Sequence, residues 1–174
     1  RIPYPVEQAV GVLKNVRHLI LVGTVSPVAF FAYPDKPSLL APSDCQIHSL
    51  AGPADDLLAA LEWLADELGV SGVVPKLQAA QRPGLVSGAL TVESIGSAIG
   101  HLLPENAIIC DESVTSGRAL HPYTRGCPPH DWLFGTGGAI GRALPEATGA
   151  AIACPDRRVL CLSGDGSAMY TLQA

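Results

Sequence analysis

The chain has 174 residues, with 11 Lys or Arg against 16 Asp or Glu, so its formal net charge is −5. This acidic balance excludes a nucleic-acid binder that works by neutralising phosphates, because such a protein needs a surplus of basic side chains on one face. Apolar residues make up 48% of the chain and charged residues only 16%, whereas roughly 25% is usual in soluble domains. A chain this apolar folds, and we expect a second copy or further chain to cover part of its surface.

Neither a membrane span nor an oxidising compartment is predicted. The longest uncharged stretch of the first third, residues 19–34, is interrupted by glycine, serine and proline. The five cysteines are odd in number and lack C-x-x-C spacing, which predicts reduced, buried thiols in a cytoplasmic protein. His121, Cys127 and His130 resemble a zinc cluster, but two prolines lie between the last two and no fourth ligand has suitable spacing.

The first half of the chain alternates predicted strands and helices. Residues 17–23 form a short apolar run that is typical of a buried strand, and residues 39–42 predict a second strand. A helix is predicted over residues 54–68, with Gly69 as its stop signal. Its apolar stripe consists of Leu57, Leu58, Leu61, Leu64 and Leu68. This alternation predicts a parallel sheet flanked by helices, in an α/β fold.

Residues 70–90 differ in character from the segment before them. They hold several glycines and prolines, and Lys76 and Arg82 are their only charged residues. Such a composition predicts a linker between two domains. We therefore divide the chain into a first domain at residues 1–69, a linker at residues 70–90 and a second domain at residues 91–174.

The second half restarts the alternation at Thr91, a candidate N-cap. The helix that follows is predicted to end before Pro104, and its apolar face consists of Val92, Ile95, Ile99 and Leu102. Residues 107–110 predict a buried strand, with a polar loop at 111–117 after its carboxyl end. We expect a further loop from there to Phe134.

A glycine-rich turn opens the last part of the chain. Residues 135–141 lead into a helix of small residues that is predicted to end near Cys154. Residues 158–162 predict another strand, residues 164–167 follow it, and a last helix is expected to begin near Ala168. Three loops therefore follow strands or open helices, and open α/β sheets bind their ligands at the carboxyl ends of the strands.

Two of these loops carry groups suited to an anion and a cation. Residues 111–117, the hydroxyl loop, contain three small hydroxyl side chains, those of Ser113, Thr115 and Ser116. They can donate to phosphate oxygens, or only cap turns. In residues 164–167, the Asp165 loop, a carboxylate stands just before a predicted helix N-terminus that favours an anion. Mg²⁺ bridges a carboxylate and phosphate oxygens, so the spacing predicts a Mg²⁺–diphosphate site, with a capped turn as the alternative.

Residues 135–141, the glycine loop, match a dinucleotide fingerprint only in part. Gly135 and Gly137 fit G-x-G, but Ile140 stands at the position of the third glycine. The glycines allow a helix to pack closely on a sheet, or a ring or phosphate to approach the backbone. A Rossmann oxidoreductase using NAD(P) would need an acidic residue after the next strand, whereas Asp156 lies before it. That enzyme and a non-catalytic nucleotide-binding module are the alternatives.

Residues 159–173, with Gly-Asp-Gly-Ser at 164–167, resemble the start of the signature of thiamine-diphosphate enzymes, in which an Asn follows further along. The resemblance extends back through residues 134–149 and 104–113, and it is closest to benzoylformate decarboxylase and acetolactate-synthase-like enzymes. It covers residues 91–174 with three loops in the family's order. The first half resembles the end of the family's Rossmann-like central domain.

The resemblance implies a role for each matching residue at the diphosphate end of the cofactor. Asp165 would bind Mg²⁺, and Gly166 and Ser167 would lie at the diphosphate of thiamine diphosphate. Thr115 and Ser116 would donate to the same diphosphate.

At the ring end, the resemblance implies that Gly138 offers its backbone carbonyl to the aminopyrimidine. Ile140 would be the large apolar side chain that holds the cofactor in its bent shape. Val114 stands where the family often has a further hydroxyl, so one diphosphate contact would be missing or made by backbone.

The resemblance also implies a reaction and a larger assembly. The reaction would split CO₂ from a 2-oxo acid, giving an aldehyde as in a decarboxylase or a 2-hydroxyketone as in a carboligase. The distal Asn would lie beyond Ala174, and the Glu that activates the aminopyrimidine would lie upstream of Arg1, usually in a partner subunit. We therefore expect a segment of a longer protein that has no catalytic residue of its own and is inactive alone. Its site would be shared within a homodimer or homotetramer.

Overall fold

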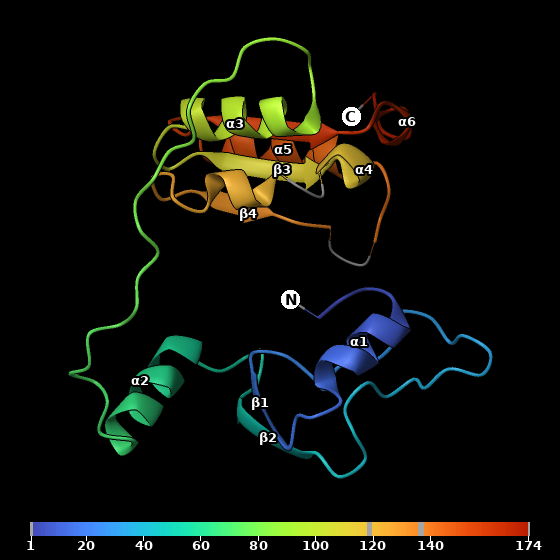
Figure 1. Ribbon diagram of the computed structural model, residues 1–174, viewed down its shortest axis with the longest axis vertical. Coiled ribbons are helices and arrows are strands. Elements are labelled where there is room, and N and C mark those ends of the chain that lie inside the picture. The colour runs from blue at the N-terminus through green and yellow to red at the C-terminus, as the bar shows by residue number, and fades with distance from the viewer. Residues whose placement is uncertain (1, 118–119, 136–137, 174) are drawn as a thin grey trace. The chain divides into compact units, whose positions relative to one another are not determined.

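The computed structural model describes residues 2–117, 120–135 and 138–173. The chain divides into two compact units, Arg1–Pro75 and Lys76–Ala174, and each is described by itself. Both units contain parallel strands and flanking helices (Figure 1), so the predicted α/β class is confirmed. No helix in the described ranges is long and apolar enough to cross a membrane.

The first unit holds a two-stranded parallel sheet and two helices. Its elements are α1 (Val6–Leu13), β1 (His18–Val22), β2 (Gln46–Ala51) and α2 (Leu57–Glu67). The buried side of α1, with Val6, Ala9 and Leu13, packs against Leu40. β1 confirms the strand predicted from the apolar run, and β2 pairs with it in parallel.

One expectation for the first unit needs correction. The strand predicted at residues 39–42 is wrong, because Leu39 makes only an isolated antiparallel bridge to Val28. The second strand is β2, which mixes polar and apolar residues and so lacks an apolar run. The helix predicted at residues 54–68 is confirmed as α2, and Asp56 caps it by accepting a hydrogen bond from the Ala59 amide at 3.0 Å. None of the α2 residues is buried within the unit, so its apolar stripe lies at the surface.

The second unit is built on a three-stranded parallel sheet in the order β4-β3-β5. Its elements are α3 (Val92–Leu102), β3 (Ile108–Glu112), α4 (Val114–Gly117), the 3₁₀ helix η1 (His121–Thr124), β4 (Asp131–Leu133), α5 (Ala143–Ala153), β5 (Val159–Ser163) and α6 (Asp165–Ala168). α5 packs against β3 and β5. The core of the unit gathers Leu103, Ala107 and Ile109, with Trp132 and Leu160 packed against them.

Both ends of α3 are fixed by polar side chains. Thr91 and Ser94 form the reciprocal capping box at its start, which confirms the predicted N-cap. At its end, the Arg82 guanidinium donates to the backbone carbonyls of His101 and Leu103, both at 2.8 Å. Arg82 thus satisfies carbonyls that the helix leaves unpaired, and part of the predicted linker belongs structurally to the second unit. The assignment of residues 70–90 as an interdomain linker stays a prediction.

The most buried residues of α3 are small, and three of the four predicted apolar residues, Val92, Ile95 and Ile99, are half-buried. Gly96, Ser97 and Gly100 are the buried residues of α3, whereas Leu102 is 69% exposed. A Cβ at Gly96 would lie 2.5 Å from a ring carbon of Tyr123, so glycine lets η1 approach the helix. The predicted apolar face is therefore half-buried except at Leu102, and glycine is needed where Tyr123 approaches the helix.

Three further expectations for the second unit are corrected. The predicted loop up to Phe134 contains η1 and β4. β4 was missed because it has only three residues and is stabilised by pairing with β3 at the edge of the sheet. The hydroxyl loop is divided between the end of β3 and the single turn α4. The last helix, expected near Ala168, begins at Asp165 as α6.

Candidate functional site

A cleft lies where the predicted loops meet at the carboxyl edge of the second sheet. β3 and β5 are neighbouring parallel strands with Glu112 opposite Ser163, so the segments that follow them start side by side. The cleft has a volume of about 690 Å³ and is lined by Val92, Glu112, Ser113, Val114, Thr115, Ser116, Ile140, Gly164, Asp165, Gly166, Ser167 and Tyr170. No histidine or cysteine is among these residues, so the cleft offers hydroxyl, carboxylate and backbone groups.

The hydroxyls of the hydroxyl loop differ in what they already bind. Ser113 donates its hydroxyl to the Asp111 carboxylate at 2.5 Å, and Ser116 donates to the Ser113 carbonyl at 3.2 Å. Thr115 is exposed, and its hydroxyl has no hydrogen-bond partner within the described ranges. Val114, between them, has a φ of 39°, which is rare for a β-branched residue. Thr115 is therefore the hydroxyl most available to a ligand.

The Asp165 loop supplies the opposite wall of the cleft. Asp165 is the first residue of α6 and is exposed. Neither its carboxylate nor the Ser167 hydroxyl forms a hydrogen bond or ion pair to another described residue. A Cβ placed on Gly166 would meet no atom within 4 Å, so this wall opens into the cleft. The two free side chains lie at the same sheet edge as Thr115.

The glycine loop contributes one of its two predicted contacts to the cleft. Ile140 lines the cleft and is 56% exposed. Gly138 has a φ of 66° but does not line it. Thr136 and Gly137, the latter part of the G-x-G match, lie outside the described residues. The structure therefore gathers six predicted site residues around one cleft, namely Thr115, Ser116, Ile140, Asp165, Gly166 and Ser167.

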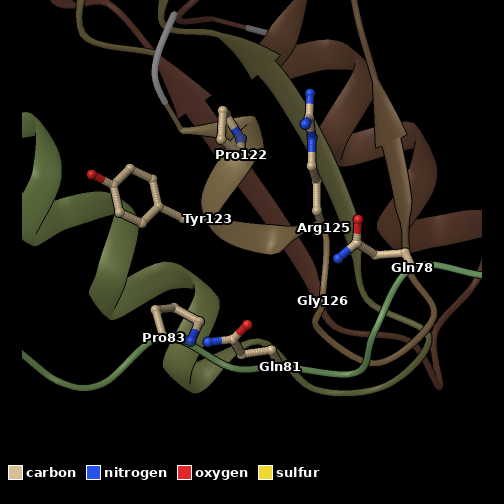
Figure 2. Close-up of a pocket in the computed structure, with 7 residues that line it drawn as sticks. All are labelled: Gln78, Gln81, Pro83, Pro122, Tyr123, Arg125 and Gly126. Atoms are coloured by element: carbon tan, nitrogen blue, oxygen red, sulfur yellow. The ribbon is translucent and has the colours of Figure 1, made fainter.

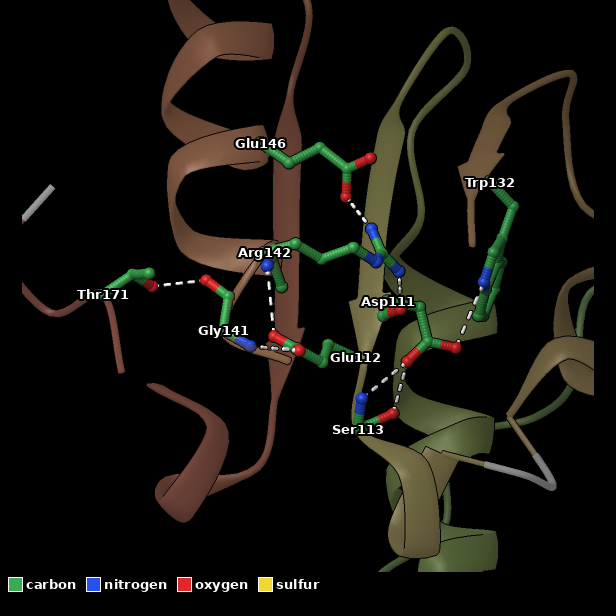
Figure 3. A network of polar contacts seen from close by, with 9 residues as sticks. Asp111, Glu112, Ser113, Trp132, Gly141, Arg142, Glu146 and Thr171 are labelled. Atoms are coloured by element: carbon green, nitrogen blue, oxygen red, sulfur yellow. Dashed lines mark hydrogen bonds and ion pairs between the residues drawn. The ribbon is translucent and has the colours of Figure 1, made fainter. Parts of the chain in front are cut away.

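Glu112 is a site residue that the sequence analysis missed. It is only 7% exposed, at the end of β3, and its carboxylate accepts hydrogen bonds from the backbone amides of Gly141 and Ala143 (Figure 3). The Thr171 hydroxyl donates to the carbonyl of Gly141. The only sequence signal was an acidic residue at the end of an apolar strand.

A polar network continues from the cleft into the helix–sheet interface (Figure 3). The Arg142 guanidinium donates to the Glu146 carboxylate and to the Asp111 carbonyl. The Asp111 carboxylate also accepts a hydrogen bond from the indole of Trp132 at 3.2 Å. The Arg142 Nε is buried, and no group in the described part of the chain accepts from it. This network joins α5 to β3 and β4, and its members are engaged with one another rather than free for a ligand.

Cysteine and histidine chemistry lies away from the cleft. Cys110 and Cys161 are register partners on β3 and β5. Burial raises the pKa of Cys110 to about 11, with a further contribution from the Glu146 carboxylate, and burial also raises the pKa of Cys161. Such thiols stay protonated at neutral pH and are poor nucleophiles.

The three residues considered as zinc ligands have other partners. The Cys127 thiol donates to the Gly100 carbonyl at 3.0 Å, and the rings of His121 and His130 pack against Trp132. Burial lowers the pKa of His121, and the positive charge of Arg125 lowers it further. Within the described residues, no group of three or more His, Cys, Asp or Glu side chains is placed to hold a metal ion.

A second pocket, of about 330 Å³, lies in the same unit where the middle of the predicted linker packs on η1 and the residues after it (Figure 2). The backbone amide of Gln81 donates to the backbone carbonyl of Gly126 there at 2.7 Å. Tyr123 and Arg125 point in different directions (Figure 2), so the aromatic and charged groups do not converge on one ligand. The pocket therefore lies where residues 78–83 pack against the rest of the second unit, and we assign it no ligand.

The fold and the cleft define a class of protein: a parallel α/β protein with a cleft of hydroxyl, carboxylate and backbone groups at the carboxyl edge of its sheet. Comparisons with known proteins give the family. Residues 114–174 match the family of the thiamine pyrophosphate enzyme, C-terminal TPP binding domain. Residues 114–174 therefore match the cofactor-binding domain of the thiamine-pyrophosphate (thiamine-diphosphate) enzymes, and the resemblance predicted from the loops is confirmed.

Several curated relatives carry names from this family. Over 174 residues, 99% of the chain, it is 53% identical to a Mycobacterium tuberculosis protein provisionally named acetolactate synthase large subunit IlvX, covering 33% of that protein. It is 33% identical to benzoylformate decarboxylase of Pseudomonas aeruginosa over 68% of the chain and 23% of the relative. It is 42% identical to the acetolactate synthase isozyme 1 large subunit of Escherichia coli over 44% of the chain and 14% of the relative.

The chain thus spans about a third, 33%, of the length of the first of these relatives and a smaller share of the other two. No solved structure shows significant similarity to it.

Proposed function

We propose that this chain supplies the diphosphate-binding part of the active site of a thiamine-diphosphate- and Mg²⁺-dependent enzyme that cleaves or ligates 2-oxo acids. The observation that carries the proposal is the cleft at the carboxyl edge of β3 and β5, which brings Thr115, Asp165 and Ser167 together with side chains free to bind. The family match supports the same cofactor.

The donor set of the cleft fits the diphosphate end of the cofactor. Thr115 and Ser167 would donate to diphosphate oxygens, and Ser116 would do so by turning its hydroxyl away from the Ser113 carbonyl. The backbone at Gly166 lies in open space beside them. Asp165 would provide one carboxylate to Mg²⁺. One carboxylate is enough for an ion that takes its remaining ligands from phosphate oxygens and water. This arrangement explains why the cleft needs no cluster of protein ligands.

The apolar part of the cleft fits the ring end. Ile140 projects an exposed apolar side chain at the cleft, where it would support the bent cofactor. The Gly138 carbonyl would accept from the aminopyrimidine. When bound, thiamine diphosphate supplies the electron sink for breaking the bond next to the carbonyl of a 2-oxo acid. The work of this chain is then to bind and orient the cofactor.

The group that activates the cofactor would come from elsewhere. Among the cleft residues, the carboxylate of Glu112 is already occupied by two backbone amides, and Asp165 is assigned to the metal. We therefore place the activating Glu outside this chain, in a site shared within a cytoplasmic homodimer or homotetramer. The relatives' names include both decarboxylases and acetolactate synthases, so the substrate class is a 2-oxo acid.

The position of Asp156 does not support the alternative of an NAD(P) oxidoreductase. Asp156, its candidate ribose ligand, lies before β5, near Asn106 and Arg157 and among none of the residues that line the cleft. The first candidate remains the one that uses the free groups of the cleft.

Calorimetric titration of the 174-residue chain tests the proposal. Thiamine diphosphate should bind in the presence of Mg²⁺ and weakly in the presence of a chelator, and NAD should not bind. Asp165→Asn should weaken Mg²⁺-dependent binding by about tenfold or more, because it removes a charged ligand. Thr148→Val is the control, since the Thr148 hydroxyl is used within α5. Binding of NAD without binding of thiamine diphosphate would refute the proposal.

A further inference from the structure

Gly141 is a junction between the glycine loop and both walls of the cleft. Its amide donates to Glu112, at the end of β3, and its carbonyl accepts from the Thr171 hydroxyl, beyond α6 (Figure 3). Its φ of 83° is in the left-handed region, and a Cβ there would lie 2.7 Å from the Cβ of Tyr170. Only glycine fits this conformation and this close approach without strain.

Glu112 is fully engaged at this junction. One carboxylate oxygen accepts from the Gly141 amide and the other accepts from the Ala143 amide at 3.1 Å. Ala143 is the first residue of α5, which has no side-chain cap of its own. A buried carboxylate that accepts backbone amides at a helix start is favoured by charge-assisted hydrogen bonding and by the helix dipole. Glu112 therefore replaces the missing cap and also fixes the end of the glycine loop.

The hydrogen bonds at Gly141 affect the position of its neighbour, Ile140. Ile140 directly precedes Gly141 and is the part of the glycine loop that lines the cleft. Its own side chain is 56% exposed, so packing does little to fix it. The position of Ile140 is instead determined through the backbone of Gly141, which is held on one side by Glu112 and on the other by Thr171. Thr115 and Asp165, at the diphosphate end, belong to α4 and α6 and form no hydrogen bond to this junction.

We propose that Glu112 and Thr171 are positioning residues that hold Gly141 and so place Ile140 for the ring end of the bound cofactor. The proposal rests on the proposed function for the identity of that cofactor. It separates the two ends of the ligand: loss of the junction weakens recognition of the rings and leaves recognition of the diphosphate intact.

Four variants of the full chain test this role. Thr171→Val removes the hydroxyl with little change of shape, and Thr171→Ser restores it. Glu112→Gln keeps the size of the side chain but loses one of the two acceptor oxygens. Glu105→Gln is the matched control, because Glu105 is an exposed carboxylate that does not line the cleft.

The first measurement needs no ligand. Hydrogen–deuterium exchange at the Gly141 and Ala143 amides should become about tenfold faster in Glu112→Gln and Thr171→Val, the change expected when one hydrogen bond of about 1.4 kcal/mol is lost. Thr171→Ser and Glu105→Gln should exchange at the rate of the unchanged chain. Equal exchange rates in all variants would overturn the positioning role, whether or not the chain binds the cofactor.

The second measurement separates the two ends of the ligand by calorimetry with Mg²⁺. Thiamine diphosphate should bind about fivefold to tenfold more weakly to Glu112→Gln and Thr171→Val, whereas inorganic pyrophosphate should bind them as it binds the unchanged chain. A parallel loss for both ligands would show a general structural defect and overturn the proposal. If the unchanged chain binds neither ligand, the proposed function fails, and the exchange rates alone decide the role of Glu112 and Thr171.

Discussion

Removal of the Arg142 guanidinium should destabilise the second unit by an amount that the structure allows to be worked out. Arg142 donates to the Glu146 carboxylate and to the Asp111 carbonyl, and the side chains of the ion pair are 13% and 29% exposed. Arg142→Ala leaves Glu146 without its partner in the helix–sheet interface. It also leaves the Asp111 carbonyl without this donor.

The magnitude follows from these contacts. Breaking a fully buried ion pair costs about 3–5 kcal/mol, and a lost hydrogen bond about 1 kcal/mol. Because Glu146 keeps partial access to water, we expect Arg142→Ala to lower the free energy of unfolding by about 2–3 kcal/mol. Replacing both partners by alanine removes the unpaired carboxylate, so the double variant should lose about 1 kcal/mol less than the sum of the single variants.

Urea unfolding followed by tryptophan fluorescence measures this loss. The chain has two tryptophans, and Trp63→Phe, in the first unit, leaves Trp132 as the reporter of the second. Trp132 lies on β4 and donates to the Asp111 carboxylate, so it reports on the sheet that contains the network. Arg158→Ala, at an exposed arginine, is the control and should change stability by less than about 0.5 kcal/mol. A similarly small effect of Arg142→Ala, or additive single and double variants, would refute the reasoning.

Two further predictions concern titrating groups in the same unit. With a pKa of about 11, the Cys110 thiol carries about one thiolate in a thousand at pH 8, against about one in four for an ordinary cysteine. Because Cys110 is fully buried, the NMR titration of its Cβ resonance measures this, and it should show no step below about pH 10; a midpoint near 8.5 would contradict the prediction. Burial and the Arg125 charge lower the pKa of His121 in the folded chain. The neutral ring therefore gives its full contribution to folding stability above the unfolded pKa, and this stability is lost as pH falls through the lower folded pKa. The NMR titration midpoint of His121 should lie below 6.5 and move up in Arg125→Ala, and a midpoint at or above 6.5 would count against the prediction.

The elements that the sequence predicts well carry a strong local signal. β1, β3 and β5 each contain an apolar run, and a capping side chain stands at the start of α2 and of α3. β2 and β4 escaped prediction because their stability comes from pairing with a neighbouring strand, which is a long-range contact. The apolar stripe on α2 was predicted from its spacing, but spacing alone does not say what that face packs against.

The candidate site likewise has a part that local sequence predicts and a part that depends on long-range contacts. Gly-Asp-Gly-Ser after an apolar strand predicts polar groups at the sheet edge because residue type and order are enough to define it, and these residues do line the cleft, although Asp165–Ala168 forms the short helix α6. Glu112 and Thr171 act through single hydrogen bonds to the backbone of Gly141, and the residues they join are 29 and 30 positions apart in the sequence. Such contacts leave no local pattern, so only the folded chain shows them.

The polar groups at the sheet edge fall into two classes with different consequences for binding. Glu112 and Ser113 are buried, and their polar atoms are satisfied by other parts of the chain. Thr115 and Asp165 are exposed and make no hydrogen bond to other described residues, so in the free chain water satisfies them. A ligand that replaces this water must offer acceptors to the hydroxyl and a cation to the carboxylate at once, as a metal-bound diphosphate does. The buried class fixes the backbone at Gly141, Ala143 and Ser113, and the exposed class supplies the side chains that we propose for the ligand.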